Sequence, residues 1–221
     1  MKDDFEFDYS DYVFDPGGRG ISNRVMAWGH KALEDTFPCT GHENDNVLEI
    51  GAGHGGHYPF VSSLFDSYLA TDISKFNLDI LGHRFRDESK VSVLKCSAYN
   101  ISELDQQFDR IIACHVLEHM LKPHEVLREM YNCTKPGGYI SLLLPSDPGI
   151  AWRLSRRVSS IVLNKQDIPY DYVMAREHVN SINNLIAFIH YYFDNIVESW
   201  RPFHIPSMDI NLFYVCHIRK T

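Results

Sequence analysis

The feature that most constrains the fold is a glycine-rich segment at residues 46–56, which reads NVLEIGAGHGG. Val47, Leu48 and Ile50 are residue types that favour a buried strand. The glycines that follow allow a sharp turn in which the backbone comes close to a ligand. We therefore expect a strand that ends in a ligand-binding loop, followed by a helix over residues 56–65 whose N-terminus faces the same ligand.

Beyond this loop, apolar runs alternate with segments of helical character. Strands are expected over residues 46–51, 67–71, 91–96, 108–114, 139–144, 195–203 and 211–219. Helices are expected over residues 23–36 after a Ser22 cap, 74–87 after a Ser74 cap, 123–133, 150–163 and 181–192, with a weak turn at 102–106. A polar loop is expected through Pro169 and Tyr170, and the short connector before the last strand makes the final pair antiparallel. The pattern predicts an α/β fold with a mostly parallel sheet covered on both faces.

The composition is that of one globular domain over residues 1–221, with 44% hydrophobic and 23% charged residues. A net charge of −8 gives no electrostatic reason to expect a nucleic-acid partner. The N-terminus is acidic and aromatic, unlike a signal peptide, and no apolar run is long enough to span a bilayer. Scattered cysteines without a C-x-x-C pair predict free thiols and a cytoplasmic location: Cys39, Cys96, Cys114, Cys133 and Cys216. The oligomeric state stays open.

The glycine spacing alone allows several ligands. Gly51, Gly53 and Gly56 satisfy G-x-G-x-x-G, which nicotinamide, flavin and other nucleotide sites share. Asp72, about twenty residues further on, can accept hydrogen bonds from ribose hydroxyls in any of them. Glu49 separates the alternatives, because its carboxylate would be unfavourable beside a pyrophosphate but would attract a ligand with a cationic amino-acid part.

Several further segments occur in an order and spacing typical of one family: LEIGAGHG at 48–55, TDIS at 71–74, FDRII at 108–112, VLEH at 116–119 and KPGG at 135–138. At these residues the sequence resembles the class I S-adenosylmethionine-dependent methyltransferases. The resemblance implies a Rossmann-like seven-stranded sheet of order 3-2-1-4-5-7-6, with strand 7 antiparallel and helices on both faces. It divides the domain into an N-terminal helical cap (1–43), a cofactor-binding core (44–145), an inserted lid (146–180) and a C-terminal helix with an antiparallel strand pair (181–221).

The resemblance also implies S-adenosylmethionine as cofactor and assigns its contacts to four places. These are Glu49, Gly51, Ala52 and Gly53 in the first loop, Asp72 and Ile73 after the second strand, Ser97 and Ala98 after the third, and Cys114 and His115 after the fourth. Other members often carry an acidic residue beside the adenine, and this sequence lacks it.

A second constellation follows the fourth strand. His115, Glu118 and His119 lie at i, i+3 and i+4, so a helical turn would place them on one side. Imidazole and carboxylate groups are good ligands for divalent ions, and His178 is a fourth candidate. The run is similar to a metal-binding Glu-x-x-Glu-His run in the small-RNA 2′-O-methyltransferases and the ubiquinone-biosynthesis O-methyltransferases, although His115 replaces the first Glu. Without a metal, His119, His115 or His178 is expected to act as general base.

A base or metal beside the methyl donor matters most for a hydroxyl, so we expect O-methylation of a small molecule or saccharide. Arg153 and Arg156 are expected to bind a phosphate or an acidic sugar, and Tyr170 to stack on a sugar ring. Solvated arginines on an exposed helix are the simpler interpretation of the same residues. N-methylation of a small molecule and a nicotinamide-dependent oxidation remain the alternative functions.

Overall fold

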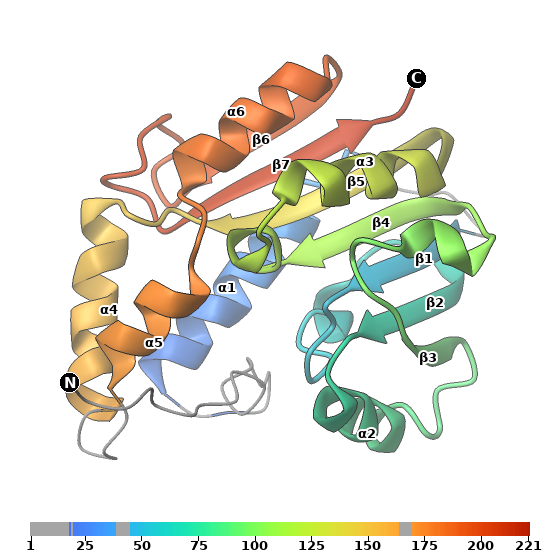
Figure 1. Cartoon of the computed structure of the whole chain (residues 1–221), viewed down its shortest axis with the longest axis horizontal. Coiled ribbons are helices and arrows are strands. Elements are labelled where there is room, and N and C mark those ends of the chain that lie inside the picture. Colours follow the sequence, from blue (N-terminus) through green and yellow to red (C-terminus); the bar gives the residue numbers. More distant parts are fainter. Residues whose placement is uncertain (1–17, 19, 39–44, 164–168) are drawn as a thin grey trace.

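The chain folds around one seven-stranded sheet of order β3-β2-β1-β4-β5-β7-β6 (Figure 1). The computed structural model describes residues 18, 20–38, 45–163 and 169–221. Its strands are β1 (Asp45–Ile50), β2 (Phe65–Asp72), β3 (Val91–Lys95), β4 (Phe108–Cys114), β5 (Thr134–Pro145), β6 (Ile196–Arg201) and β7 (Phe213–Arg219). The strands β1 to β5 pair in parallel, and β7 runs antiparallel to both β5 and β6. The Rossmann-like order and the antiparallel seventh strand are therefore confirmed.

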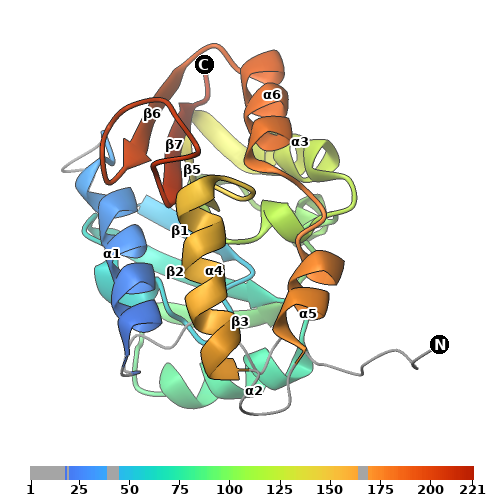
Figure 2. The ribbon, with the colours of Figure 1, turned by 90° about the vertical axis from the view of Figure 1, so that its left-hand side faces the viewer.

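Helices cover both faces of this sheet. They are α1 (Ile21–Asp35), α2 (Lys75–Arg84), α3 (Pro123–Cys133), α4 (Ile150–Leu163), α5 (Tyr170–Glu177) and α6 (Ile182–Tyr192), with short 3₁₀ turns η2 (Tyr58–Phe60), η3 (Ile101–Leu104) and η4 (Leu117–His119). One buried cluster packs α3 and α6 on one face, and a second packs α1 and α2 on the other. Figure 2 shows α4 and α5 together at the end of the sheet where the parallel strands finish. No described helix is both long and apolar enough to cross a membrane.

The central strand β4 shows why the sheet is buried on both sides. Ile111 and Ala113 pack into the cluster with α3 and α6, whereas Ile112 and Cys114 pack into the cluster with α1 and α2. Successive side chains point to opposite faces, so a strand covered twice needs apolar residues at almost every position. Arg110 is the exception among the buried residues of β4, and it is fully buried on the α1 face.

The prediction of a helix over residues 56–65 is wrong. Only the short turn η2 forms, and the chain enters β2 at Phe65. The backbone N–H of Ser62 donates to Glu34 Oε2 at 3.1 Å instead of to a carbonyl one turn back. A long-range contact with α1 thus replaces the helical hydrogen bond that the local sequence suggested.

Smaller differences have local causes. Gly20, at φ 128°, and not Ser22, precedes α1. The strand β5 begins at Thr134, before the expected start at Tyr139, and includes the segment at Pro136 through a register shift against β4. The helix α5 replaces part of the expected polar loop. The cysteines that the structure describes are free thiols, and Cys39 lies outside the described residues.

Candidate functional site

The glycine loop follows β1 and has the backbone that only glycine adopts easily. Gly51, Gly53 and Gly55 have φ angles of 62°, 54° and 73°. The third left-handed position is Gly55, whereas the third glycine of the G-x-G-x-x-G spacing is Gly56. A Cβ atom on Gly51 would lie 2.7 Å from Val116 Cγ2, so the loop packs closely on the segment after β4.

Asp72, at the end of β2, ties this loop to the next helix. Its Oδ2 accepts from the Gly53 N–H at 2.9 Å, and its Oδ1 accepts from the Ser74 N–H at 2.8 Å. A carboxylate offers about four lone-pair sites, so both oxygens can still accept hydroxyl groups of a ligand. Ile73 beside it is 66% exposed, which leaves an apolar surface next to the carboxylate.

The remaining expected cofactor contacts fall into two groups. Ser97 and Ala98 are half-buried after β3, whose Lys95 pairs with Asp72, so they lie at the same sheet edge as Ile73. Glu49 and Cys114, in contrast, are buried on the face that α1 covers. The Tyr68 hydroxyl donates to Glu49 Oε2 at 2.6 Å. Burial raises the pKa of Glu49 and also the pKa of the Cys114 thiol.

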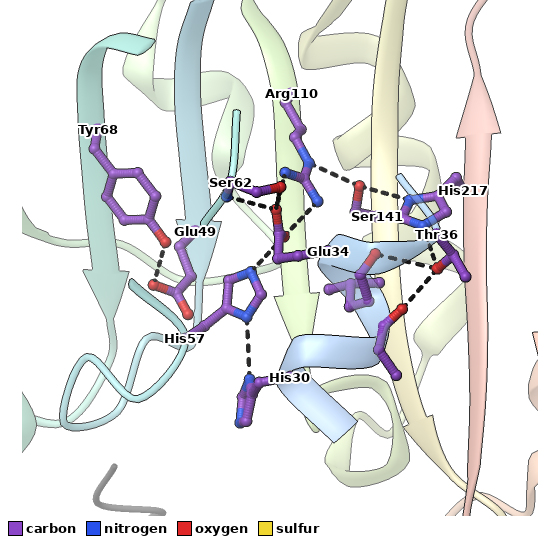
Figure 3. Close-up of polar contacts among 12 residues, drawn as sticks. His30, Glu34, Thr36, Glu49, His57, Ser62, Tyr68, Arg110, Ser141 and His217 are labelled. Atoms are coloured by element: carbon purple, nitrogen blue, oxygen red, sulfur yellow. Dashed lines mark hydrogen bonds and ion pairs between the residues drawn. The ribbon is translucent and has the colours of Figure 1, made fainter. Parts of the chain in front are cut away.

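Under α1 lies a buried polar network that the sequence did not reveal (Figure 3). Arg110 donates to both oxygens of Glu34, at 2.7 and 3.0 Å, and His57 Nε2 donates to Glu34 Oε1 at 2.9 Å. Burial alone would raise the pKa of Glu34, but the charge of Arg110 and these hydrogen bonds outweigh it and hold that pKa well below its usual range. The available signal was an arginine in the middle of an apolar strand, which requires a buried anion as partner.

The network continues across the sheet. Arg110 Nε donates to the Ser141 hydroxyl at 2.9 Å, and His217 Nδ1 lies 3.0 Å from the same oxygen. Desolvation by burial lowers the pKa of His217 to about 3, so this ring is neutral near pH 7. The network therefore joins α1, the segment after the glycine loop, β4, β5 and β7.

The second expected constellation does assemble, on the turn η4 after β4. His115 Nδ1 lies 3.3 Å from Glu118 Oε1, and His119 Nε2 lies 4.0 Å from the same oxygen. One ligand atom from each of Glu118, His119 and His178 lies within 4.8 Å of the others. The structure thus brings His178, at the end of α5, to the residues after β4. The turn is a 3₁₀ helix, and His115 precedes it with a φ of 57°.

Both outer histidines of this cluster are oriented through Nδ1. His119 Nδ1 lies 3.0 Å from the main-chain carbonyl of Glu177, and His178 Nδ1 lies 3.1 Å from Asp147 Oδ2. Because these oxygens only accept, the neutral rings carry their protons on Nδ1 and their lone pairs on Nε2. Desolvation by burial lowers the pKa of His119.

Glu118 is the buried anion of the cluster. Burial alone would raise the pKa of Glu118, but the hydrogen bond from His115 and the neighbouring imidazoles outweigh this effect, so the pKa is lowered overall. Glu118 Oε2 and His115 Nε2 are buried without a hydrogen-bond partner among the described residues. Such atoms cost free energy unless a ligand satisfies them. The donor set fits a divalent ion, and the Nδ1 contacts follow the way metal-ligating histidines are held.

The expected acceptor residues are less well placed. Arg156 pairs with Asp147 Oδ2 at 3.5 Å, so it supports the histidine cluster. Arg153 is exposed on α4. The side chain of Tyr170 lies outside those that the structure describes.

Sequence comparison gives a match to a family of methyltransferase domains over residues 48–142. A hybrid PKS-NRPS synthetase of Fusarium sp. is 35% identical over 141 residues, and equisetin synthetase of Fusarium heterosporum is 35% identical over the same length. Each alignment covers 59% of this chain, and the chain spans only 3% of those proteins. An uncharacterised methyltransferase of Schizosaccharomyces pombe is 29% identical, over 63% of this chain and 51% of its own length.

Solved structures show the same fold at low identity. The CurJ carbon methyltransferase has a TM-score of 0.63 at 17% identity, with 90% of this chain and 55% of that chain covered. The N-methyltransferase NodS of Bradyrhizobium japonicum has a TM-score of 0.61 at 14% identity, with 89% and 95% covered. The [4+2]-cyclase SpnF has a TM-score of 0.65 at 13% identity, with 94% and 85% covered.

The names of these structures differ in chemistry, so the fold does not identify an acceptor. The match over residues 48–142 nevertheless coincides with β1 to β5, and this part includes the glycine loop and the turn η4. Residues 48–142 are therefore similar to a methyltransferase domain, and the chain around them has the fold of solved methyltransferases.

Proposed function

We propose that the chain transfers the methyl group of S-adenosylmethionine to an acceptor atom that must first lose a proton, and that this atom is an acidic carbon flanked by carbonyl groups. The observation that carries the proposal is the oriented pair His119 and His178 beside the buried carboxylate of Glu118. Each ring is fixed by a hydrogen bond at Nδ1, which leaves Nε2 as the basic nitrogen.

The proposed cofactor contacts follow from the glycine loop. The left-handed loop lets the ligand approach the backbone at Gly51 and Gly53, and Asp72 accepts from ribose hydroxyls. The exposed side chain of Ile73 gives the adenine an apolar surface. When bound, S-adenosylmethionine supplies a methyl group that is already activated. The protein has to align the acceptor, remove its proton and exclude water.

The strength of the base selects the acceptor class. Because burial lowers the pKa of His119, the ring is neutral at pH 7 but only weakly basic. Proton transfer is efficient when the two pKa values are close, so a weak base suits an acidic carbon better than an alcohol. After His119 takes the proton, the carboxylate of Glu118, 4.0 Å away, stabilises the imidazolium.

The printed names of similar proteins agree with this choice. The curated relatives include synthetases of polyketide type, and one solved neighbour is a carbon methyltransferase. In a β-ketoacyl group, which polyketide synthesis produces, the carbon between the two carbonyl groups is acidic. We therefore name a β-ketoacyl thioester as the acceptor class to test.

One observation favours a second candidate, which is the O-methylation of a small molecule or saccharide. Glu118 Oε2 lacks a hydrogen-bond partner in the described part of the chain, and one oxygen of the Glu118 carboxylate lies with nitrogens of His119 and His178 in an arrangement that fits a divalent ion. A bound ion lowers the pKa of a hydroxyl and makes a weak base sufficient. In that case the exposed Arg153, in the proposed lid over residues 146–180, would meet an acidic group of the saccharide.

Methyl transfer to a matched set of acceptors tests both candidates. The full chain is incubated with S-adenosylmethionine and a β-ketoacyl thioester, a phenol, a nucleotide sugar or an amine, with and without a chelator, and products are identified by mass spectrometry. We expect methylation of the thioester at carbon that is insensitive to chelation. It should be strongly slowed in His119→Ala but retained in His83→Ala, whose histidine is exposed on α2. Sugar methylation that chelation abolishes would favour the second candidate, and methylation of the amine alone would contradict both.

A further inference from the structure

A second group of metal-ligand residues lies beneath α1, apart from the cluster on η4. One ring nitrogen each of His30 and His57 and the sulfur of Cys114 lie within 4.8 Å of one another, and all three residues are buried. They come from α1, from the segment after the glycine loop and from the end of β4. Neither the proposed proton transfer nor the proposed cofactor contacts use the two histidines.

The spacing of the two rings suits a shared ion. His30 Nδ1 and His57 Nδ1 lie 3.1 Å apart. Zinc–nitrogen bonds of about 2.0–2.1 Å at a tetrahedral angle place two nitrogen ligands roughly 3.3 Å apart. An ion between the rings would take the place of the single proton that they can share, with a shift of only a few tenths of an ångström by this estimate.

The other ring nitrogen of His57 makes the hydrogen bond that is typical of a metal-ligating histidine. His57 Nε2 donates to Glu34 Oε1 at 2.9 Å, and Arg110 holds that carboxylate in place (Figure 3). Metal-ligating histidines characteristically donate their other N–H to a carboxylate, which fixes the tautomer and makes the ligating nitrogen more basic. The lone pair of His57 is thereby directed to Nδ1, on the side of His30.

The charges in this region favour a cation. The charge of Glu34 is offset by Arg110, whereas Glu49 has the neutral Tyr68 hydroxyl as a hydrogen-bond donor and interacts with His57. A divalent ion bound by Cys114 as thiolate, next to an ionised Glu49, would leave the region electrically neutral. The thiol proton would be released on binding.

We infer that His30, His57 and Cys114 form a buried site for a divalent transition-metal ion of the zinc class. Thiolate and imidazole ligands favour zinc or cobalt over magnesium or calcium. Since the ligands belong to three separate segments, a bound ion would link α1 to β4 and to the segment after the glycine loop. The triad on η4 has one carboxylate and two imidazoles, so the presence of sulfur distinguishes the two sites.

Cobalt substitution tests the site directly. The full chain is stripped with a chelator, loaded with a single equivalent of Co²⁺ and followed by absorption. We expect a thiolate-to-cobalt charge-transfer band in the near ultraviolet. This band should disappear in Cys114→Ser and persist in Cys216→Ser, which changes another fully buried cysteine. It should also persist in His119→Ala, which alters only the η4 triad.

The wild-type spectrum decides the matter even if Cys114→Ser fails to fold. His30→Gln gives a second measurement, with cobalt affinity expected to fall about 10-fold or more while circular dichroism stays unchanged. A folded wild-type protein without the thiolate band, or a band that survives Cys114→Ser, would overturn the inference. The two histidines would then be a hydrogen-bonded pair only.

Discussion

The two histidine-bearing clusters of this molecule use similar residues in different ways. Under α1, Glu34 accepts hydrogen bonds at both carboxylate oxygens, from Arg110, His57 and Ser62. On η4, Glu118 is equally buried, yet its Oε2 has no partner among the described residues. A fully satisfied buried carboxylate stabilises the fold, whereas an unsatisfied one costs free energy that only a ligand or a transition state can recover.

The cations beside these carboxylates differ as well. Arg110 keeps its charge at every accessible pH, so the pair with Glu34 is permanent. The neighbours of Glu118 are the imidazoles of His115 and His119, which unlike a guanidinium carry no permanent charge. The first cluster is therefore suited to holding structure and the second to moving a proton.

The largest effect is expected from Arg110→Met, because it leaves Glu34 buried without its cation. The free energy of unfolding should fall by about 3–5 kcal/mol in urea titrations. Lys135→Met is the matched control, since it breaks a partly exposed pair with Asp109 of 2.7 Å and should cost under about 1 kcal/mol. The double variant Arg110→Met with Glu34→Gln should recover part of the loss. Equal losses in Arg110→Met and Lys135→Met would mean that the buried pair under α1 does not stabilise the fold more than a partly exposed pair.

Replacing a side chain of the η4 cluster should lower the reaction rate and leave the free energy of unfolding nearly unchanged. His119→Ala should lower kcat about 10²-fold, the low end for loss of a general base, with the affinity for S-adenosylmethionine and the free energy of unfolding nearly unchanged. Initial rates, calorimetry and urea titrations measure the three quantities. A variant with unchanged kcat would exclude His119 as the base.

The fold was predictable where local signals were strong. The range of β4 and the Ser74 cap of α2 match the sequence prediction, because a continuous apolar run and a capping hydroxyl act locally. The helix α5 was missed because no side chain caps it after Pro169. Burial of Val173 and Met174 holds it in place, and that depends on tertiary packing.

The site was predictable to the same extent. Sequence spacing grouped His115, Glu118 and His119. The family's topology, in which the loop after the fifth strand lies near the end of the fourth, added His178. The anchoring role of Asp147 was not foreseen, because its contact with His178 joins residues 31 positions apart. Sequence spacing carries no information about such a contact until the fold is known.

Acidification should lower the free energy of unfolding through His217, which belongs to the network under α1. Burial lowers the pKa of His217 from its usual 6.5 to about 3. The unfolded chain therefore binds a proton below pH 6.5 that the folded chain refuses, and the free energy of unfolding decreases as the pH falls. Per histidine the slope approaches about 1.4 kcal/mol per pH unit.

Urea titrations between pH 6.5 and pH 5 measure this slope before most carboxylates titrate. His217→Asn should flatten it, because the replacement cannot take up a proton. Identical slopes in wild type and His217→Asn would mean that burial of this ring does not control the acid stability.

The smallest effect is expected from Asp147→Asn, which keeps the shape of the anchor of His178 but removes its charge. If Asp147 acts by orienting His178 and raising its basicity, kcat should fall about 10-fold while the affinity for S-adenosylmethionine stays the same. Glu177→Ala is the matched control at the other histidine, because His119 contacts the main-chain carbonyl of Glu177 and not its side chain. Initial rates should therefore be nearly normal in Glu177→Ala, and an equal loss in both variants would assign the effect to a shift of α5 and not to the carboxylate of Asp147.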